Sequence, residues 1–262
     1  MPGPDRLGAG CAMRVMITLW RRELSAYFAS PLAYAVWFFF LLLMGVGFFW
    51  LLQVRALEPT DTGAWRPLMG PHPHLWLGLL ILVPVITMRS FAEERRSGSL
   101  ETLLTAPVTE WQVVAAKFAG AVTFYMVCWS PTVFHVWLLT RIGAVPFPLD
   151  YRVLGATYVG ILLLGLFYLA LGLLASALTR HQAVAALMTV VVLGGLFLAG
   201  FTPYYVRTSW IREAGHYVSA VRHMTEFSRG VVDTRPLVFY LSGTWVALFA
   251  VVKVIEARKW SG

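Results

Sequence analysis

Residues 89–107 read Arg89-Ser-Phe-Ala-Glu-Glu-Arg-Arg-Ser-Gly-Ser-Leu-Glu-Thr-Leu-Leu-Thr-Ala-Pro107, a charged stretch between two long apolar runs. The stretch combines clustered charges with a glycine and a short apolar stripe. Charged side chains are costly next to a bilayer, so a cluster that is kept there indicates a function. We interpret this stretch as a docking surface at one face of a membrane.

The composition is that of a polytopic membrane protein. Hydrophobic residues make up 58% of the 262 residues and charged residues only 13%, and the mean hydropathy is +0.69. Soluble globular domains average about 45–50% apolar and about 25% charged residues. The net charge of +8 comes from basic residues that are scattered between apolar runs. Membrane orientation explains this distribution better than nucleic-acid binding does, so no nucleic acid is expected as a partner.

Six apolar runs are interpreted as membrane-spanning helices, and the second, with only 14 apolar positions from Leu75 to Met88, is expected to run on to Ala92 with the Arg89 side chain reaching toward the interface. The predicted fold class is therefore an all-α polytopic membrane protein, with a six-helix transmembrane domain over residues 32–262 after an N-terminal segment over residues 1–31. Pro84 and Pro131 lie inside two of the runs and are expected to bend them. The predicted spans cover residues 32–52, 75–92, 113–139, 153–178, 183–205 and 237–252.

The distribution of basic residues predicts how the spans are oriented. An even number of spans puts both termini on one side of the membrane. With the N-terminus in the cytoplasm, most of the 21 Lys and Arg residues fall on the cytoplasmic side once one long outer loop is set aside. We therefore expect cytoplasmic termini in a bacterial-type inner (plasma) membrane. The loop that is set aside holds Arg207, Arg212, Arg222, Arg229 and Arg235.

Residues 14–28 have the spacing of an amphipathic helix. Leu24 and Phe28 share one face, and Arg22 lies on the other. A basic face opposite an aromatic and aliphatic face suits a helix that lies in the inner headgroup region. The alternative is a plain extension of the first span, which we disfavour because Pro31 separates the two segments.

A second amphipathic pattern lies in the outer loop, residues 206–236. Tyr217, Val221 and Met224 recur there at helical spacing, opposite charged side chains. Gly215 is expected to divide this helix into two pieces. Both a passive amphipathic cap and a gate fit the pattern, and the sequence leaves the two open.

Local signals predict a helix, a turn and a second helix within residues 89–112, which we term the elbow. The second span is expected to continue as a polar helix up to Arg96. Gly98 then offers the positive φ of a turn. At the end of the elbow, the capping-box pattern Thr109-x-x-Gln112 is expected to start the third span.

The second helix of the elbow is short and amphipathic. Ser99 can cap it, Glu101 faces the positive end of its dipole, and Pro107 ends it. Because so short a helix is not stable alone, its apolar stripe needs a packing partner. That partner is either the lipid interface and the chain's own helices or, as we favour, the groove of a soluble protein. The stripe consists of Leu100, Leu103 and Leu104.

At these residues the chain resembles a known family. The run 92–108 reads Ala-Glu-Glu-Arg-Arg-Ser-Gly-Ser-Leu-Glu-Thr-Leu-Leu-Thr-Ala-Pro-Val and is followed by Lys117. It is similar to the signature of ABC-2 type transporter permeases, and most of all to their gliding-motility-associated branch. Ser30-Pro31 and the stretches 226–235 and 256–260 resemble the same branch. The resemblance implies a type V exporter-like permease fold with an N-terminal interfacial helix.

In that family the elbow is a coupling helix, which receives motion from a nucleotide-binding subunit. The resemblance implies that the apolar stripe packs in the ATPase groove and that Arg180, between the fourth and fifth spans, forms a second contact. Ser99 stands where the family usually has Thr, and either residue can cap. The residues implicated in coupling are Glu93, Glu94, Arg95, Arg96, Gly98, Ser99, Leu100, Glu101, Leu103, Leu104, Pro107 and Arg180.

The sequence offers no site for ATP or for catalysis. It lacks the Gly-x-x-x-x-Gly-Lys-Ser/Thr pattern of a P-loop, so ATP and Mg are expected on a separate ATPase subunit. His72-Pro73-His74 lacks a further ligand at suitable spacing, so no metal is expected. No Gly-x-Ser-x-Gly or His-Glu-x-x-His pattern occurs. The chain is therefore not expected to be an enzyme by itself, and we assign it no catalytic, cofactor-binding or metal-binding residue.

We interpret the chain as the permease subunit of an ABC-2 type exporter, embedded in membrane lipid and paired with a second permease chain, identical or different. The weaker alternative is an ion-coupled secondary transporter or channel without an ATPase partner. It is weaker because no Asp, Glu, Lys or Arg lies in the middle of a predicted span. Aromatic residues along the spans favour an amphipathic or lipid-linked cargo over ions.

Overall fold

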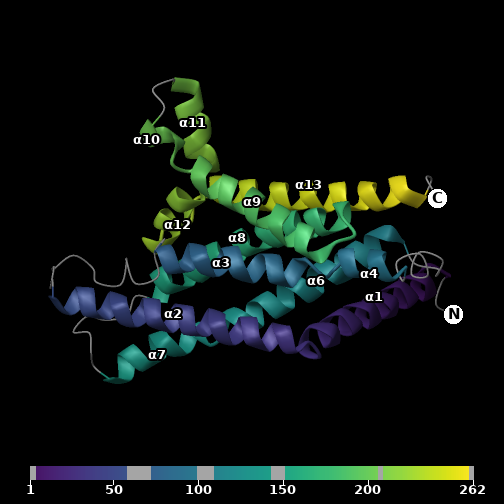
Figure 1. Ribbon diagram of the computed structural model, residues 1–262, viewed down its shortest axis with the longest axis horizontal. Helices are drawn as coiled ribbons and strands as arrows, with labels where there is room; N and C mark the ends of the chain where they lie inside the picture. Colours follow the sequence, from purple (N-terminus) through teal and green to yellow (C-terminus); the bar gives the residue numbers. More distant parts are fainter. Residues whose placement is uncertain (1–3, 58–71, 99–108, 143–150, 206–208, 260–262) are drawn as a thin grey trace.

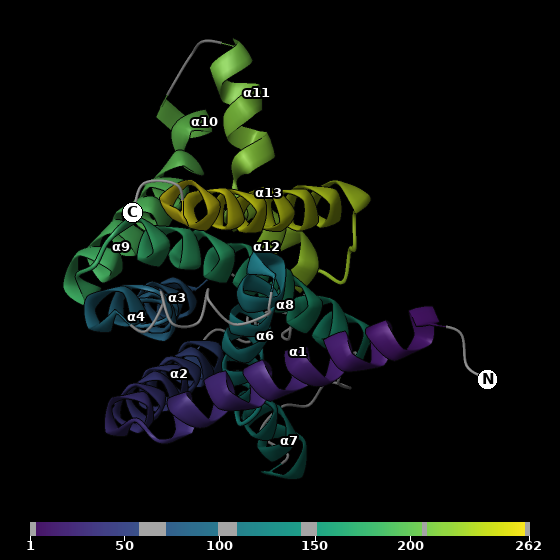
Figure 2. The ribbon, with the colours of Figure 1, turned by 90° about the vertical axis from the view of Figure 1, so that its right-hand side faces the viewer.

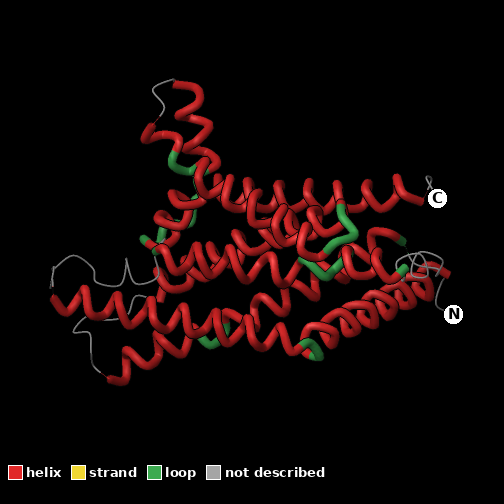
Figure 3. The backbone as a smooth tube through the Cα atoms, viewed as in Figure 1, coloured by secondary structure: helices red, strands yellow, loops and turns green. Residues whose placement is uncertain are grey.

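The computed structural model describes residues 4–57, 72–98, 109–142, 151–205 and 209–259, which form helices joined by short loops (Figure 1; Figure 3). No strand occurs in these ranges. Six helices in the described chain are long and apolar enough to cross a membrane. The predicted all-α fold with six spans is therefore confirmed.

Shorter helices lie between and beside the spans. The spans are α2, α3, α6 with α7, α8, α9 and α13. In chain order the helices are α1 (Pro4–Phe28), α2 (Pro31–Leu57), α3 (Pro73–Thr87), α4 (Ala92–Ser97), α6 (Glu110–Trp129), α7 (Thr132–Ile142), α8 (Tyr151–Leu178), α9 (Gln182–Ala199), α10 (Thr202–Tyr205), α11 (Ser209–Val218), α12 (Ala220–Ser228) and α13 (Thr234–Lys259).

Two of the predicted spans are interrupted. The third span consists of α6 and α7, which are separated at Ser130 and Pro131. Pro131 causes this break because proline lacks a backbone N–H and its ring crowds the preceding turn. The fifth span ends at Ala199, and α10 follows as a separate short helix after Gly200 and Phe201. Pro84, in contrast, lies inside α3 without ending it.

Helix α8 lies at the centre of the bundle, where it packs on α3, α6, α9, α12 and α13. Of its most apolar stretch 72% is buried, compared with 17% for α9 and 22% for α2. A Cβ atom at Gly165 would collide with the Tyr125 ring, and one at Gly172 with Thr87. These glycines therefore let α6 and α3 approach α8 closely. The outward apolar side chains of α2 and α9 suit helices that face lipid.

Helix α1 crosses one end of the bundle over α6 and does not continue the first span (Figure 2). It is separated from α2 just before Pro31. Trp20 Nε1 donates a hydrogen bond to Thr123 Oγ1 at 3.2 Å, and the Tyr27 ring stacks on Phe124 with the centroids 5.1 Å apart. The aromatic face of α1 therefore packs on protein, and its position at the inner headgroup region stays a prediction.

The two ends of the bundle differ in what they carry. One end holds the start of α1, the end of α13, helix α4 and the link between α8 and α9 (Figure 1). We term it the elbow end. Both described ends of the chain are thus on one side, as an even number of spans requires. At the other end α12 packs on α8, while α10 and α11 project sideways from the bundle.

The outer loop contains two amphipathic helices, but the break between them is not at Gly215 as predicted. Gly215 lies inside α11, and the break falls at Ser219. The Ser219 hydroxyl accepts a hydrogen bond from the backbone N–H of Arg222 at 3.3 Å and so caps α12. Serine is among the best N-cap residues, and this local signal outweighs the glycine.

Candidate functional site

Turns at residues 88–91 separate α3 from α4, so the second span does not continue as one unbroken helix to Arg96. Phe91 and Ala92 each donate a backbone N–H to Ser176 Oγ on α8 at 3.1 Å, and Ser176 Oγ donates to the carbonyl of Met88 at 3.3 Å. The turn also buries the Phe91 side chain completely. The predicted continuous helix is therefore wrong, because α8 offers this backbone both a hydroxyl and an apolar surface.

Helix α4 has an exposed face and an anchored face. Glu93 and Arg96 are exposed, together with Ser97 and Gly98 at its end. On the other face, Arg95 Nη1 donates to the carbonyl of Ala177 at 2.9 Å. Gly98 has a φ of 74°, so the predicted left-handed turn is confirmed. The acidic first turn and basic last turn of α4 suit the helix dipole.

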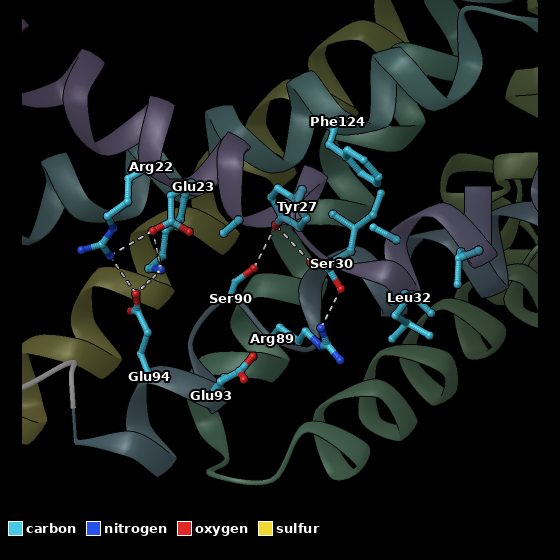
Figure 4. Close-up of a pocket in the computed structure, with 16 residues that line it drawn as sticks. Arg22, Glu23, Tyr27, Ser30, Leu32, Arg89, Ser90, Glu93, Glu94 and Phe124 are labelled. Atoms are coloured by element: carbon cyan, nitrogen blue, oxygen red, sulfur yellow. Dashed lines mark hydrogen bonds and ion pairs between the residues drawn. The ribbon is translucent and has the colours of Figure 1, made fainter. Parts of the chain in front are cut away.

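Glu94 points inward and joins a cluster of four charges, Arg22, Glu23, Glu94 and Lys117, which we term the charge cluster (Figure 4). Lys117 Nζ lies 2.8 Å from Glu94 Oε1 and 3.0 Å from Glu23 Oε1. Arg22 Nη2 lies 3.0 Å from Glu94 Oε1 and 3.2 Å from Glu23 Oε1. Lys117 Nζ also lies 5.3 Å from the centroid of the Phe91 ring. Two cations and two carboxylates thus tie together α1, α4 and α6.

Three members of the charge cluster are largely withdrawn from solvent, whereas the side chain of Arg22 is 52% exposed. The side chain of Lys117 is 3% exposed, and those of Glu23 and Glu94 are 13% and 17% exposed. Removing one member of a buried ion pair leaves the other charge uncompensated, which is strongly unfavourable. A displacement of α4 must therefore carry α1 and α6 with it or break these ion pairs. Helix α4 thus connects an exposed surface with two packed helices.

Sequence reasoning assigned no contacts to Lys117, Arg22 or Glu23. A signal for the first of these was present, since Lys117 lies in an early turn of an apolar span and a lysine there needs a counter-charge. No local signal identified Glu23 as that counter-charge, because it lies on a separate helix 94 positions earlier in the chain.

Arg180 lies in the link between α8 and α9, at the same end of the bundle as α4. Its side chain is exposed. Arg95 bonds to Ala177 in the last turn of α8, so the structure brings α4 and this link together. The two predicted contact regions therefore form one continuous end of the molecule.

The rest of the elbow is described by the structure only from residue 109 onward. The predicted capping box is confirmed: Thr109 Oγ1 accepts from the Gln112 N–H at 3.3 Å, and Gln112 Oε1 accepts from the Thr109 N–H at 3.0 Å. The predicted short helix and its stripe lie outside the described residues, and the roles proposed for them stay predictions. These residues are Ser99, Leu100, Glu101, Leu103, Leu104 and Pro107.

A cavity of about 240 Å³ adjoins the charge cluster between α1, α2, α3 and α6. Tyr27 lies at its wall and donates its hydroxyl to the carbonyl of Ile86 at 3.1 Å, while Ser90 Oγ lies 3.2 Å from the same hydroxyl. Burial raises the pKa of the Tyr27 hydroxyl well above its usual range, so the group stays a hydrogen-bond donor.

No metal centre is formed by the part of the chain that the structure describes. No group of three or more His, Cys, Asp and Glu residues in those ranges could hold a metal ion. The rings of His72 and His74 stack with their centroids 5.3 Å apart.

Comparison with known proteins connects this architecture to a family. A family model described as ABC-2 family transporter protein matches residues 73–233. Two relatives, both described as probable multidrug ABC transporter permease YbhR, come from Escherichia coli strain K12 and from Escherichia coli O157:H7. Each is 26% identical to this chain over 153 residues, which is 57% of this chain but only 39% of the relative. Neither finding names the gliding-motility-associated branch, so that assignment stays a prediction.

Proposed function

Because this chain belongs to the ABC-2 transporter family, we propose that it is the membrane-spanning permease subunit of an ATP-driven exporter. A separate nucleotide-binding subunit holds ATP and Mg in this proposal, and two permease chains, identical or different, form the pathway. The elbow end faces the cytoplasm and the nucleotide-binding subunit. The name of the YbhR relatives makes a drug-like amphiphile the first cargo to test.

The observation that carries the proposal is the construction of α4. Its exposed face, Glu93 and Arg96, is available to a partner, while its inward face is fixed to α8 through Arg95 and to α1 and α6 through Glu94. A rigid connection of this kind suits a part that transmits motion between subunits. Closure of the ATPase dimer would shift α4, and the spans would then change their exposure.

The alternative function is an ion-coupled secondary transporter or channel. Such proteins mark their pathways with ionisable residues at membrane depth. Among the residues that the structure describes, Lys117 is the one Lys, Arg, Asp or Glu that is fully buried. It lies toward the elbow end of α6 and is neutralised by Glu23 and Glu94. This arrangement favours a structural tie over an ion pathway.

The structure suggests where to test the coupling. Glu94 and Arg95 bond within the chain, so their substitution would disturb the fold as well as a partner. Arg96 is exposed on α4 and is the better position. We expect gentle purification from native membranes to recover a soluble P-loop ATPase with this chain. In R96E the amount of ATPase retained by this chain should fall by at least about tenfold, as expected when like charges are brought together at an interface.

The matched control is Arg235→Glu, which reverses an exposed charge at the opposite end of the bundle. ATPase retention in this variant should equal that of the unchanged chain. Repeated recovery of the chain without an ATPase would count against the proposal, and so would equal retention in R96E and R235E. Transport into purified vesicles without ATP would instead support the ion-coupled alternative.

A further inference from the structure

The cavity beside the charge cluster has a polar end and an apolar end. Its polar end is formed by Ser30 and Arg89 together with the charge cluster, as Figure 4 shows. Its apolar walls come from the first turns of α2, the last turns of α3 and one ring of α6. These walls are Leu32, Ala33, Val36, Val85, Ile86 and Phe124.

Arg89 is the cation in this cavity whose hydrogen bonding is incomplete. Its Nη1 donates to Ser30 Oγ at 2.9 Å. Its Nε is buried and has no hydrogen-bond partner in the described chain. Ser30 Oγ accepts the bond from Arg89, which leaves the hydroxyl proton available to an acceptor. A guanidinium edge and a hydroxyl that point into one cavity match the oxygens of a phosphate group.

The nearby carboxylates do not form ion pairs with Arg89. Glu23 and Glu94 are engaged by Arg22 and Lys117 at 2.8–3.2 Å. Glu93 also lines the cavity, but no ion pair joins it to Arg89 among the described residues. The cavity therefore keeps one partly buried cation, Arg89, that forms no ion pair within the described chain, with Glu93 as the remaining carboxylate of the lining.

The apolar end of the cavity indicates that the anion carries a hydrocarbon chain. Most of the walls belong to α2 and α3, which are membrane spans, and the lining residue Leu32 is 37% exposed. A volume of about 240 Å³ is smaller than the pockets that enclose whole drug-sized ligands. It suits a headgroup and the first carbons of a chain, while the remainder of the chain leaves past Leu32 into the bilayer.

We propose that this cavity binds the phosphate of an anionic phospholipid, with Arg89 and Ser30 as its polar contacts and Leu32, Val36 and Val85 against its chain. The bound lipid would join the start of α2 to the end of α3, directly before the elbow. This proposal does not rest on the proposed transport function, because it concerns binding and stability alone.

The test is a lipid titration of the purified full chain, with any subunit that remains bound to it, in a neutral detergent. Native mass spectrometry would count bound phosphatidylglycerol, and a thermal melt would record stabilisation. We expect phosphatidylglycerol to bind and to raise the melting temperature, and phosphatidylcholine to do so at least about tenfold more weakly. R89Q should weaken phosphatidylglycerol binding by at least about tenfold, the loss of a charge-assisted hydrogen bond.

Arg21→Gln is the matched control, since Arg21 is an exposed cation of α1 at the same end that does not line the cavity. It should bind phosphatidylglycerol as the unchanged chain does. Ser30→Ala provides a second variant if R89Q does not fold, and its binding should also weaken. Glycerol phosphate added without a chain should have no effect at the same concentration.

Three outcomes would overturn the proposal. Equal binding of phosphatidylglycerol by R89Q, or by S30A if R89Q does not fold, would remove the site. Equal affinity for phosphatidylcholine would show that no anion is selected. Equal stabilisation by glycerol phosphate or inorganic phosphate would identify a site for a free anion.

Discussion

Two polar sites share one cavity at the elbow end, and they differ in how their charges are satisfied. In the charge cluster, Lys117 has two carboxylates within 3.0 Å, and Arg22 reaches the same two carboxylates. At Arg89 the guanidinium has one serine hydroxyl and a buried Nε without a partner in the described chain. The first site holds helices together, whereas the second has a donor that no group in the described chain accepts from, and a bound lipid phosphate would complete it. The difference teaches that buried charge alone does not distinguish a tie from a binding site.

The largest loss of stability is expected from Lys117→Met, which breaks the charge cluster. Methionine fills a similar volume but leaves Glu23 and Glu94 close together and largely buried, with only the half-exposed Arg22 to balance their two charges. Loss of one partner of a buried ion pair costs about 3–5 kcal/mol. The melting temperature in detergent and the yield of folded protein should both fall sharply, as measured by thermal unfolding and size-exclusion chromatography.

Lys253→Met is the control for this prediction. Lys253 pairs with Glu256 at 2.6 Å, but the two side chains are 56% and 36% exposed. An exposed pair contributes about 0–1 kcal/mol, so K253M should leave the melting temperature nearly unchanged. If K117M and K253M shift it equally, the charge cluster is not the tie that we describe.

A smaller effect is expected from Ser176→Ala, which acts on the segment that connects the two sites. The substitution removes the acceptor of the Phe91 and Ala92 N–H groups in a buried turn. Unsatisfied buried donors cost about 1–3 kcal/mol. Thermal unfolding should show this loss, and hydrogen exchange at Phe91 and Ala92 should become faster.

Ser242→Ala serves as the comparison for S176A, because Ser242 is exposed on α13 and bonds only to carbonyls of its own helix. We expect no measurable change in stability there. Unchanged exchange rates at Phe91 and Ala92 in S176A would mean that the turn holds without the hydroxyl.

The smallest change in stability is expected from Arg89→Gln in lipid-free detergent. The charge removed is partly buried and has no ion pair in the described chain, so the lost bond to Ser30 is partly offset because the buried Nε no longer lacks an acceptor. The change in unfolding free energy should be no more than about 1 kcal/mol. A loss in R89Q as large as that in K117M would contradict the distinction between the two sites.

Much of the fold could be predicted from the sequence because the signals are local. Hydropathy along the chain located the six spans, Gly98 marked the left-handed turn, and Thr109 with Gln112 marked the start of α6. Each signal depends on residues within a few positions of one another. The predicted break at Gly215 was misplaced, because the N-cap signal of Ser219 was not considered.

The faces of the elbow could not be predicted in the same way. Glu93 and Glu94 are adjacent and chemically equivalent in the sequence, yet one is exposed and the other belongs to the charge cluster. The same holds for Arg95 and Arg96. Helical geometry places neighbouring side chains on different faces, but only the packing of α1, α6 and α8 decides which face is inward.

By itself, the sequence determined that this protein is a membrane bundle with a charged elbow, because apolar length and local turn chemistry are properties of short segments. Only the tertiary structure decided which charges of the elbow end are paired. Lys117 meets Glu23, and the backbone at Phe91 meets Ser176, across 94 and 85 positions of sequence. Such pairings depend on where separate helices pack, which no short window of sequence specifies. The same packing placed Arg89 beside a cavity and without an ion pair in the described chain, which distinguishes the proposed lipid site from the charge cluster.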